Sequence, residues 1–348
     1  MCGIAGYIGR KHVNRSNKVK TLALMANRGP DANGQSSFEN GGVYVDLLHT
    51  RLSIIDLDKR ADQPMSIDGV SIIFNGEIYN YVEIRDQLKS EGIVFATESD
   101  TEVLLRAYLK YGKSCVNRFE GMWSFAIYDI KKRELFLSRD RFGEKPLYIY
   151  READGIFFAS EIKFLKALSG VNFEINRKHI CRYLVNGYKS LAKTEGTFFS
   201  GIEEFPRSAN MLIGLDIAPK LTTYWAPVFA PRDMSMAAAI EKIRYLLFKS
   251  IKLRLRSDVP LAFCLSGGVD SAAIASIAAK CFKYDVATFS IIDKDERYNE
   301  YGNIRATIDD LNCEHTIIHT GEENFLPRMK SLVGYHDAPV ATMSYYVH

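Results

Sequence analysis

The chain begins Met1-Cys2-Gly3-Ile4-Ala5-Gly6, and the second of these residues explains much of the two hundred that follow. Once the initiator methionine is removed, Cys2 becomes the first residue, and its thiol shares one amino acid with a free α-amino group. That amino group has an ordinary pKa of about 8, so it can accept the proton of the thiol near neutral pH. Cys2 is therefore a candidate nucleophile that needs no catalytic histidine. A second-position cysteine is a weak signal by itself, so its meaning depends on the residues around it in the fold.

Length and composition are those of a globular protein with two domains. The chain has 348 residues, 47% of them hydrophobic and 25% charged, and a domain commonly holds about 150 residues. A net charge of +3 gives no field that would attract nucleic acid or an anionic membrane. We expect no membrane span and no signal peptide, because no sufficiently long apolar run is present. Six cysteines without a CxxC pair predict reduced thiols and a cytoplasmic protein.

The first two hundred residues predict a layered α+β domain. Seven short β-like runs are separated by Gly, Asn and Asp turns: residues 3–8, 43–48, 70–74, 123–128, 134–138, 147–150 and 156–159. Residues 81–91 and 100–111 have apolar side chains at helical spacing. Many strands with few helices are typical of stacked sheets that are covered by helices.

Polar residues at the ends of these runs fit a site for an amino-acid amide. Arg51 follows an apolar strand, and its guanidinium can bind an α-carboxylate through paired donors. Asp100 begins a helix and can pair with an α-ammonium group. The side chain of Asn75 and the N–H of Gly76 can form an oxyanion hole for a tetrahedral intermediate. Each residue alone also fits a structural role, as a surface charge, a turn or a helix cap, but together with Cys2 they indicate amide cleavage.

These residues lie within a longer series of motifs that resembles the class II, N-terminal-nucleophile glutamine amidotransferase domain of glutamine-dependent asparagine synthetases. The matching segments are residues 1–6, 28–31, 49–54, 75–80, 99–102, 119–122, 139–148 and 158–163. The resemblance implies a layered α/β/β/α fold in which Cys2 is the nucleophile and Asn75 and Gly76 form the oxyanion hole. It implies a glutamine pocket made by Arg51, Leu52, Ser53, Ile54, Ile55, Asn75, Gly76, Glu77 and Asp100. Cys2 would attack the glutamine amide, release ammonia and leave a glutamyl thioester for water to hydrolyse.

The rest of the chain predicts a second domain with a doubly wound parallel sheet. Prolines in residues 208–231 indicate a linker between a glutaminase domain at 2–207 and a second domain at 232–348. The second domain opens with an amphipathic helix at 234–255. Its three terminal cations suit a helix C-terminus and are too few for nucleic-acid binding. Strands and helices then alternate: a buried strand at 260–265, a helix to about 282, a strand at 286–292, a helix at 299–311 and a strand at 315–319.

The turn Ser266-Gly267-Gly268-Val269-Asp270-Ser271 lies between the first of these strands and its helix. This geometry presents backbone N–H groups to phosphate, but it is not a Walker A loop, because no Gly-Lys-Ser/Thr follows. The turn resembles the pyrophosphate-binding loop of the ATP pyrophosphatase family, again as in asparagine synthetases. The resemblance implies that ATP and Mg²⁺ are cofactors, that Asp270 binds Mg²⁺ with pyrophosphate, and that ATP is held by Leu265, Ser266, Gly267, Gly268, Asp270, Ser271 and Ile291.

The implied reaction joins ammonia from glutamine to an acceptor carboxylate that ATP has activated as an acyl-adenylate. Ammonia would travel unprotonated, which favours a closed route between the two sites. Aspartate is the first choice of acceptor by resemblance. However, residues 335–342 depart from the Thr-Thr-x-Arg segment of standard asparagine synthetases and look closer to variants that amidate other carboxylates, such as uronic acids of surface polysaccharides. A non-catalytic glutamine-binding regulator is a further alternative, although Cys2 and Asn75 are both present.

The sequence leaves several properties open. His336 is expected to be structural, with a substrate contact as the alternative. The chain stops within an apolar run and before a second pyrophosphate segment, so we expect an incomplete synthetase domain that hydrolyses glutamine without forming an amide from ATP. Removal of Met1 and assembly into a homodimer are not decided by the sequence.

Overall fold

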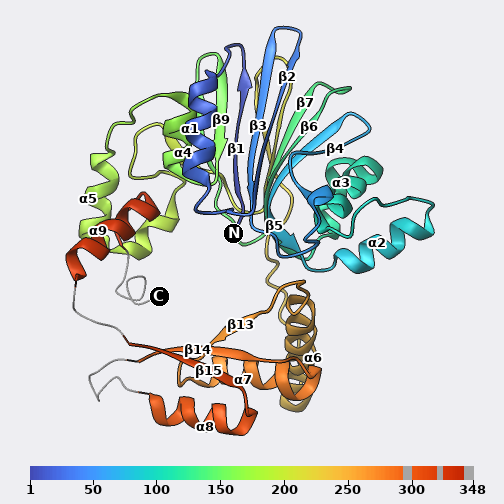
Figure 1. Ribbon diagram of the computed structural model, residues 1–348, viewed down its shortest axis with the longest axis vertical. Coiled ribbons are helices and arrows are strands. Elements are labelled where there is room, and N and C mark those ends of the chain that lie inside the picture. Colours follow the sequence, from blue (N-terminus) through green and yellow to red (C-terminus); the bar gives the residue numbers. More distant parts are fainter. Residues whose placement is uncertain (293–299, 320–323, 341–348) are drawn as a thin grey trace. The chain divides into compact units, whose positions relative to one another are not determined.

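The computed structural model describes residues 1–292, 300–319 and 324–340. It divides into two compact units, Met1–Val228 and Phe229–His348. The first unit is a stack of two six-stranded antiparallel sheets with helices on the outside (Figure 1).

The first sheet has the order β10-β8-β9-β1-β3-β2. At its centre β1 (Gly3–Gly9), which is buried along its whole length, pairs with β3 (Val43–Arg51). The remaining strands are β2 (Ala32–Asn40), β8 (Tyr148–Glu152), β9 (Gly155–Ala159) and β10 (Ile202–Glu204). Because β1 starts directly after Cys2, a central strand with neighbours on both sides fixes the position of the thiol.

The second sheet has the order β12-β11-β7-β6-β5-β4. Its longest pair is β5 (Val70–Ile78) with β6 (Gly121–Asp129). The other strands are β4 (Met65–Ile67), β7 (Glu134–Arg139), β11 (Ala209–Ile213) and β12 (Lys220–Thr223). Side chains alternate between the two faces of β5: Ile73 packs between the sheets, and Ile72 and Phe74 pack on the outer face.

Helices cover both outer faces, so the expected α/β/β/α order is confirmed. Outside the first sheet, α1 (Arg15–Met25) and α4 (Ile162–Ser169) share an apolar cluster with it. Outside the second sheet, α2 (Tyr81–Ser90) and α3 (Asp100–Tyr111) do the same. A third cluster fills the space between the sheets. The unit also contains α5 (Arg177–Asn186) and three short 3₁₀ segments, Lys59–Ala61, Gly112–Arg118 and Tyr188–Lys193.

Two strands lie within the stretch that the sequence predicts to be a linker, residues 208–231. β11 and β12 extend the second sheet, and Ala209, Met211 and Ile213 are buried. The Tyr224 hydroxyl donates to the carbonyl of Arg139 at 2.9 Å. The boundary between the units falls after Val228, inside the predicted linker, and the first unit extends about twenty residues beyond its predicted end at residue 207. In β11 the buried apolar residues Ala209, Met211 and Ile213 occur at every second position, but the run is short. Pro206 and Pro219 stand before and after it, so the sequence pattern favours a linker.

The second unit contains a parallel sheet of order β13-β14-β15, as expected. Its elements are α6 (Met236–Arg254), β13 (Ala262–Cys264), α7 (Val269–Ser276) continued by a π-helical turn (Ile277–Cys281), β14 (Ala287–Ile292), α8 (Tyr301–Leu311), β15 (Glu314–His319) and α9 (Phe325–His336). Right-handed crossovers that advance in one direction place their helices on one face, and α6, α7 and α8 share one apolar cluster. β13 is not the buried strand expected, because Ala262 and Cys264 are exposed. No described helix is long and apolar enough to cross a membrane.

Candidate active site

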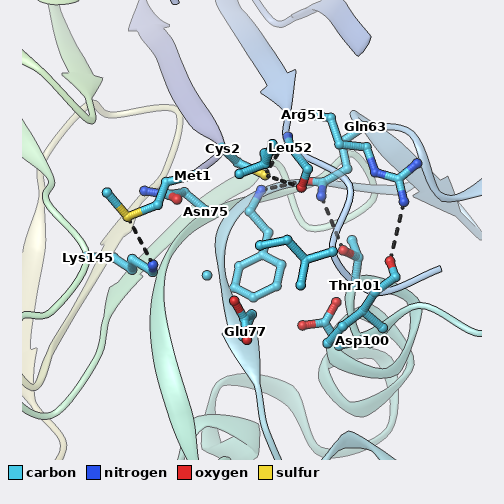
Figure 2. A pocket seen from close by; sticks show the side chains of 14 residues that line it. Met1, Cys2, Arg51, Leu52, Gln63, Asn75, Glu77, Asp100, Thr101 and Lys145 are labelled. Atoms are coloured by element: carbon cyan, nitrogen blue, oxygen red, sulfur yellow. Dashed lines mark hydrogen bonds between the residues drawn. The ribbon is translucent and has the colours of Figure 1, made fainter. Parts of the chain in front are cut away.

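A pocket lies beside Cys2, where β1 begins and β3 ends (Figure 2). Nearly all residues predicted for the glutamine site line it: Cys2, Arg51, Leu52, Ile54, Ile55, Asn75, Gly76, Glu77 and Asp100. Ser53 does not line the pocket, and its N–H instead donates to Asp31 Oδ2 at 2.7 Å. The fold thus brings together segments from β1, β3, β5 and α3 that are up to a hundred residues apart.

Cys2 is held by contacts to its thiol and to its own carbonyl. The N–H of Leu52 lies 3.4 Å from Sγ, and the Cys2 carbonyl accepts a hydrogen bond from Arg28 Nε at 2.8 Å. Burial raises the pKa of the Cys2 thiol, and the Leu52 N–H opposes this effect. A buried thiol of this kind is protonated at neutral pH, so it needs a base before it can attack.

The α-amino group lies in the same pocket, on Met1. Burial lowers the pKa of this amino group, and the cations Arg28 and Lys145 lower it further. Lys145 Nζ lies 3.3 Å from Met1 Sδ, so the Met1 side chain occupies space inside the pocket. A lowered pKa favours the neutral form of the amino group, which is the form that can accept a proton.

Asn75 is the least satisfied polar residue of the pocket. Its side chain is 1% exposed, and neither Oδ1 nor Nδ2 has a hydrogen-bond partner among the described residues. Such groups are rare in folded proteins, because an unpaired buried amide is costly. At Gly76, a Cβ atom would lie 2.2 Å from the Met122 carbonyl oxygen, so only glycine fits there. The strand therefore brings an unpaired amide and a glycine without a side chain to the wall beside Cys2.

Asp100 is buried at the opposite wall, as the first residue of α3. Burial raises the pKa of its carboxyl to about 7, although the Ile78 N–H donates to Oδ2 at 3.0 Å. Burial also raises the pKa of Glu77, whereas Lys145 lowers it. A cationic ligand group at this end would restore the ionised form of Asp100.

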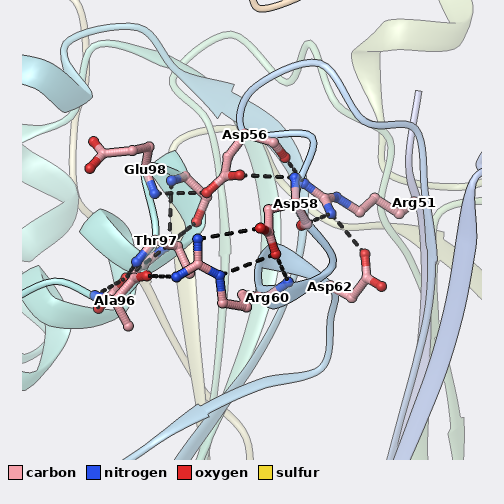
Figure 3. A network of polar contacts seen from close by, with 10 residues as sticks. Arg51, Asp56, Asp58, Arg60, Asp62, Ala96, Thr97 and Glu98 are labelled. Carbon is pink, nitrogen blue, oxygen red and sulfur yellow. Dashed lines mark hydrogen bonds and ion pairs between the residues drawn. The ribbon is translucent and has the colours of Figure 1, made fainter.

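Arg51 makes extensive contacts with the loop that follows it (Figure 3). Its Nη1 donates to Asp62 Oδ1 at 2.7 Å and to the Asp58 carbonyl at 3.0 Å. Its Nη2 donates to the carbonyls of Ile55, at 3.4 Å, and of Asp56. Asp56, Asp58 and Asp62 do not line the pocket, so three of these four bonds hold the guanidinium from outside it. Arg51 is at the predicted place, but its paired donors already serve the loop.

The same loop is tied to the segment before α3. Asp56 Oδ2 accepts the N–H of Glu98 at 2.7 Å, and Arg60 Nη1 donates to the Ala96 carbonyl at 3.0 Å (Figure 3). The pocket walls that carry Arg51 and Asp100 are therefore joined by polar contacts.

The predicted ATP loop follows β13 and leads into α7. Ser271 Oγ accepts the N–H of Ser266 at 3.1 Å and donates to the Gly268 carbonyl at 3.2 Å, which closes the turn. A Cβ on Gly267 would lie 2.5 Å from Glu300 Cβ, so the chain passes too closely for a side chain. Leu265 is buried, and its N–H donates to the Phe289 carbonyl at 2.8 Å.

The donor set of this loop fits phosphate better than a bare metal ion. α7 leaves its first N–H groups without helical partners, which suits an anion. Asp270 is exposed in the first turn of α7, and Ile291 lies half-buried in β14. Within the part of the chain that the structure describes, no three His, Cys, Asp or Glu side chains are grouped to hold a metal. Mg²⁺ bound at Asp270 would therefore need most of its oxygen ligands from phosphate and water.

Two known families match the chain, one in each of its two units. A glutamine amidotransferase domain model matches residues 1–225, and an asparagine synthase model matches residues 242–347. A Methanocaldococcus jannaschii protein provisionally named glutamine-hydrolysing asparagine synthetase 2 is 30% identical over 375 residues, which cover 99% of this chain and 70% of that protein. The chain belongs to the family of glutamine-hydrolysing asparagine synthetases.

Other relatives of this synthetase family are longer than the chain. Glutamine-hydrolysing asparagine synthetase 1 of Bacillus subtilis is 30% identical over 348 residues, which cover 98% of this chain and 54% of that protein. The chain thus spans about half of that relative. A solved structure described as the allosteric regulatory enzyme of purine biosynthesis aligns over 99% of this chain and 90% of its own, with 13% identity and a TM-score of 0.49.

Five residues that line the pocket were not predicted as glutamine contacts: Met1, Gln63, Phe74, Thr101 and Lys145. Thr101 and Lys145 lie inside two of the family motifs, residues 99–102 and 139–148. Their position in these motifs could have indicated that they lie near the pocket. Gln63 stands in none of these motifs. Its Nε2 donates to Thr101 Oγ1 at 3.2 Å, a contact that no local pattern reveals.

Proposed function

We propose that the first unit hydrolyses glutamine at Cys2 and that the ammonia is joined to an acceptor carboxylate that Mg-ATP activates at the second unit. The observation that carries the proposal is Asn75, whose buried amide has no partner among the described residues and lies beside the thiol. A developing oxyanion would supply the missing partner. A glutamine-binding regulator without chemistry would have no use for this unpaired amide.

The proposed reaction begins when the α-amino group of Cys2, freed by removal of Met1, takes the thiol proton. Sγ then attacks the amide carbon of glutamine, and the oxygen accepts hydrogen bonds from Asn75 Nδ2 and the Gly76 N–H. The protonated amino group returns its proton to the leaving nitrogen, so ammonia departs and a thioester with Cys2 is left. The same amine then takes a proton from water as the water attacks the thioester, and it returns that proton to the sulfur. Glutamate and the free thiol are released.

Two residues would hold the amino-acid end of glutamine. Asp100 would pair with the α-ammonium group, which favours its ionised form despite burial. Arg51 would attract the α-carboxylate through its positive charge, with its orientation set by the loop from Ile55 to Asp62.

The second unit would bind ATP at the turn between β13 and α7. When bound, Mg-ATP activates a carboxylate for attack by ammonia. The uncovered N–H groups at the start of α7 would receive phosphate oxygens, Gly267 and Gly268 would permit close approach, and Asp270 would face Mg²⁺. Such a reaction uses ATP and is expected in the cytoplasm.

Aspartate is the proposed acceptor, because the relatives are named as asparagine synthetases. A uronic acid of a surface polysaccharide is the alternative suggested by residues 335–342, of which 341 and 342 lie outside the described residues. An acceptor screen that measures AMP formation with glutamine and Mg-ATP in the full-length protein separates the two.

Replacement of the nucleophile tests the glutaminase proposal. Cys2→Ala should abolish glutamate formation from glutamine, whereas Cys181→Ala, an exposed cysteine of α5, should leave it unchanged. Ammonia-dependent amide formation by the full-length protein should survive Cys2→Ala. Intact-mass measurement should show that the active form lacks Met1. Unchanged glutamine hydrolysis in Cys2→Ala would refute the proposal.

A further inference from the structure

We propose that His49 and Gln63 are positioning residues, which bind the carbonyl and the N–H of Phe74 at one edge of β5 and so aim the side-chain amide of the next residue, Asn75, at the oxyanion. The inference rests on the proposed glutaminase activity, and it assigns the two residues a part in that reaction that is indirect. Neither needs to touch glutamine for it.

Both backbone groups of Phe74 are bound by side chains. Its N–H donates to Gln63 Oε1 at 2.6 Å, and its carbonyl lies 3.1 Å from His49 Nε2. These contacts begin where the β4–β5 ladder stops, because its last pair is Met65 with Ile72. Extended by two residues, the ladder would place Gln63 opposite Phe74. Side chains thus replace a strand partner on this edge of β5, at the residue directly before Asn75.

The two gripping side chains are themselves anchored in the elements that carry the other parts of the site. His49 belongs to β3, two residues before Arg51, and it is fully buried. Gln63 is also buried, and its Nε2 donates to Thr101 Oγ1, next to Asp100 (Figure 2). The backbone of Phe74 is therefore connected through the side chains of His49 and Gln63 to the two segments that carry Arg51 and Asp100.

His49 can act only as a neutral donor. Burial lowers its pKa to about 3, so the imidazole is uncharged at neutral pH. Because the partner of Nε2 is a carbonyl, that nitrogen carries the proton. The other nitrogen, Nδ1, is buried without a partner among the described residues, so the ring has a single hydrogen bond to give. That bond goes to the peptide before Asn75.

A matched pair of amide variants isolates this bond. In His49→Gln the side-chain nitrogen can reach the place of Nε2, whereas in His49→Asn it is one methylene too short. Displacement of a catalytic group by about 1 Å can lower a rate about 100-fold, so His49→Asn should lower kcat for glutamine hydrolysis by about 10-fold to about 100-fold. KM should change little, since an oxyanion hole acts in the transition state. His49→Gln should stay near the wild type, and Gln63→Asn should resemble His49→Asn.

Two further measurements separate positioning from a general structural role. An aldehyde analogue of glutamine adds to the Cys2 thiol and places an oxygen in the oxyanion hole, so its inhibition constant should rise as kcat falls. Alkylation of Cys2 by iodoacetamide forms no oxyanion, so its rate should be the same in all variants.

The outcomes distinguish this inference from the proposed function. An inactive wild type lacking Met1 overturns both. An active wild type with unchanged kcat in His49→Asn overturns the positioning role alone, as does a parallel loss of alkylation. If His49→Asn and Gln63→Asn both fail to fold while His49→Gln folds, the contacts serve the fold and the positioning role is also overturned.

Discussion

Asn75→Ala should change activity and stability in opposite directions. Removal of one oxyanion-hole donor lowers kcat by about 10²–10³-fold, or about 2.7–4 kcal/mol. The folded protein, however, loses two buried polar atoms that have no partner among the described residues. Each such atom costs about 1–3 kcal/mol, and the lost packing costs about 2 kcal/mol. The free energy of unfolding should therefore stay the same or rise, by no more than about 4 kcal/mol.

Asn80→Ala is the matched control for this experiment. Asn80 Nδ2 donates to the Arg118 carbonyl at 2.9 Å, and Oδ1 accepts the N–H of Glu120 at 2.8 Å. Loss of both bonds should lower the free energy of unfolding by about 1–3 kcal/mol and leave glutamine hydrolysis intact. Initial rates of glutamate formation and urea unfolding measure the two effects. Unchanged kcat in Asn75→Ala, or a loss of stability as large as that of Asn80→Ala, would refute the reasoning.

Three further predictions concern the same pocket. Because burial raises the pKa of Asp100 to about 7, kcat/KM for glutamine should rise with pH through about 7, and Asp100→Asn should abolish that rise. Because the pKa of Asp100 is higher in the folded than in the unfolded protein, the free energy of unfolding falls as the pH rises from the unfolded to the folded pKa. Asp100→Asn removes this loss, so the variant should unfold at a higher urea concentration than the wild type at pH 8. Gly76→Ala should lower the free energy of unfolding by about 1–3 kcal/mol or more, because its Cβ meets the Met122 oxygen; Gly302→Ala, with open space around it, is the control. Asp62→Ala should raise KM for glutamine more than it lowers kcat, since it loosens Arg51, and steady-state kinetics will show the split.

Strands with apolar side chains on both faces were predictable, and polar edge elements were not. All seven predicted strands of the first unit exist, because buried central strands are rich in apolar residues. β2 (Ala32–Asn40) was missed, since its sequence is polar and only its pairing with β3 makes it a strand. α1 (Arg15–Met25) was missed for a similar reason, as it buries only Thr21 and Met25. Tertiary pairing, which local pattern does not encode, decided both elements.

The residues predicted for glutamine share a different kind of signal. Cys2, Asn75 and Asp100 have chemistry of their own, so motif and position were enough to single them out. Lys145 reaches the pocket only because Asp140 folds the turn before it: the Asp140 carboxylate accepts the N–H groups of Phe142, Glu144 and Lys145 at 2.9–3.0 Å. The position of Lys145 is thus set by another residue and cannot be inferred from the sequence alone. The same is true of Gln63, whose side chain is placed by its contacts with Phe74 and Thr101.

The two ends of the pocket differ in how far their polar groups are satisfied before any ligand arrives. At one end, Arg51 already gives its terminal nitrogens to Asp62 and to loop carbonyls, so its orientation is fixed and few new bonds remain to be made. At the other end, Asn75 has no partner among the described residues. A group that gains its partner only when charge develops on the amide oxygen stabilises the transition state more than the bound substrate. Changes around Arg51 should therefore appear mainly in KM, and changes at Asn75 or its supports mainly in kcat.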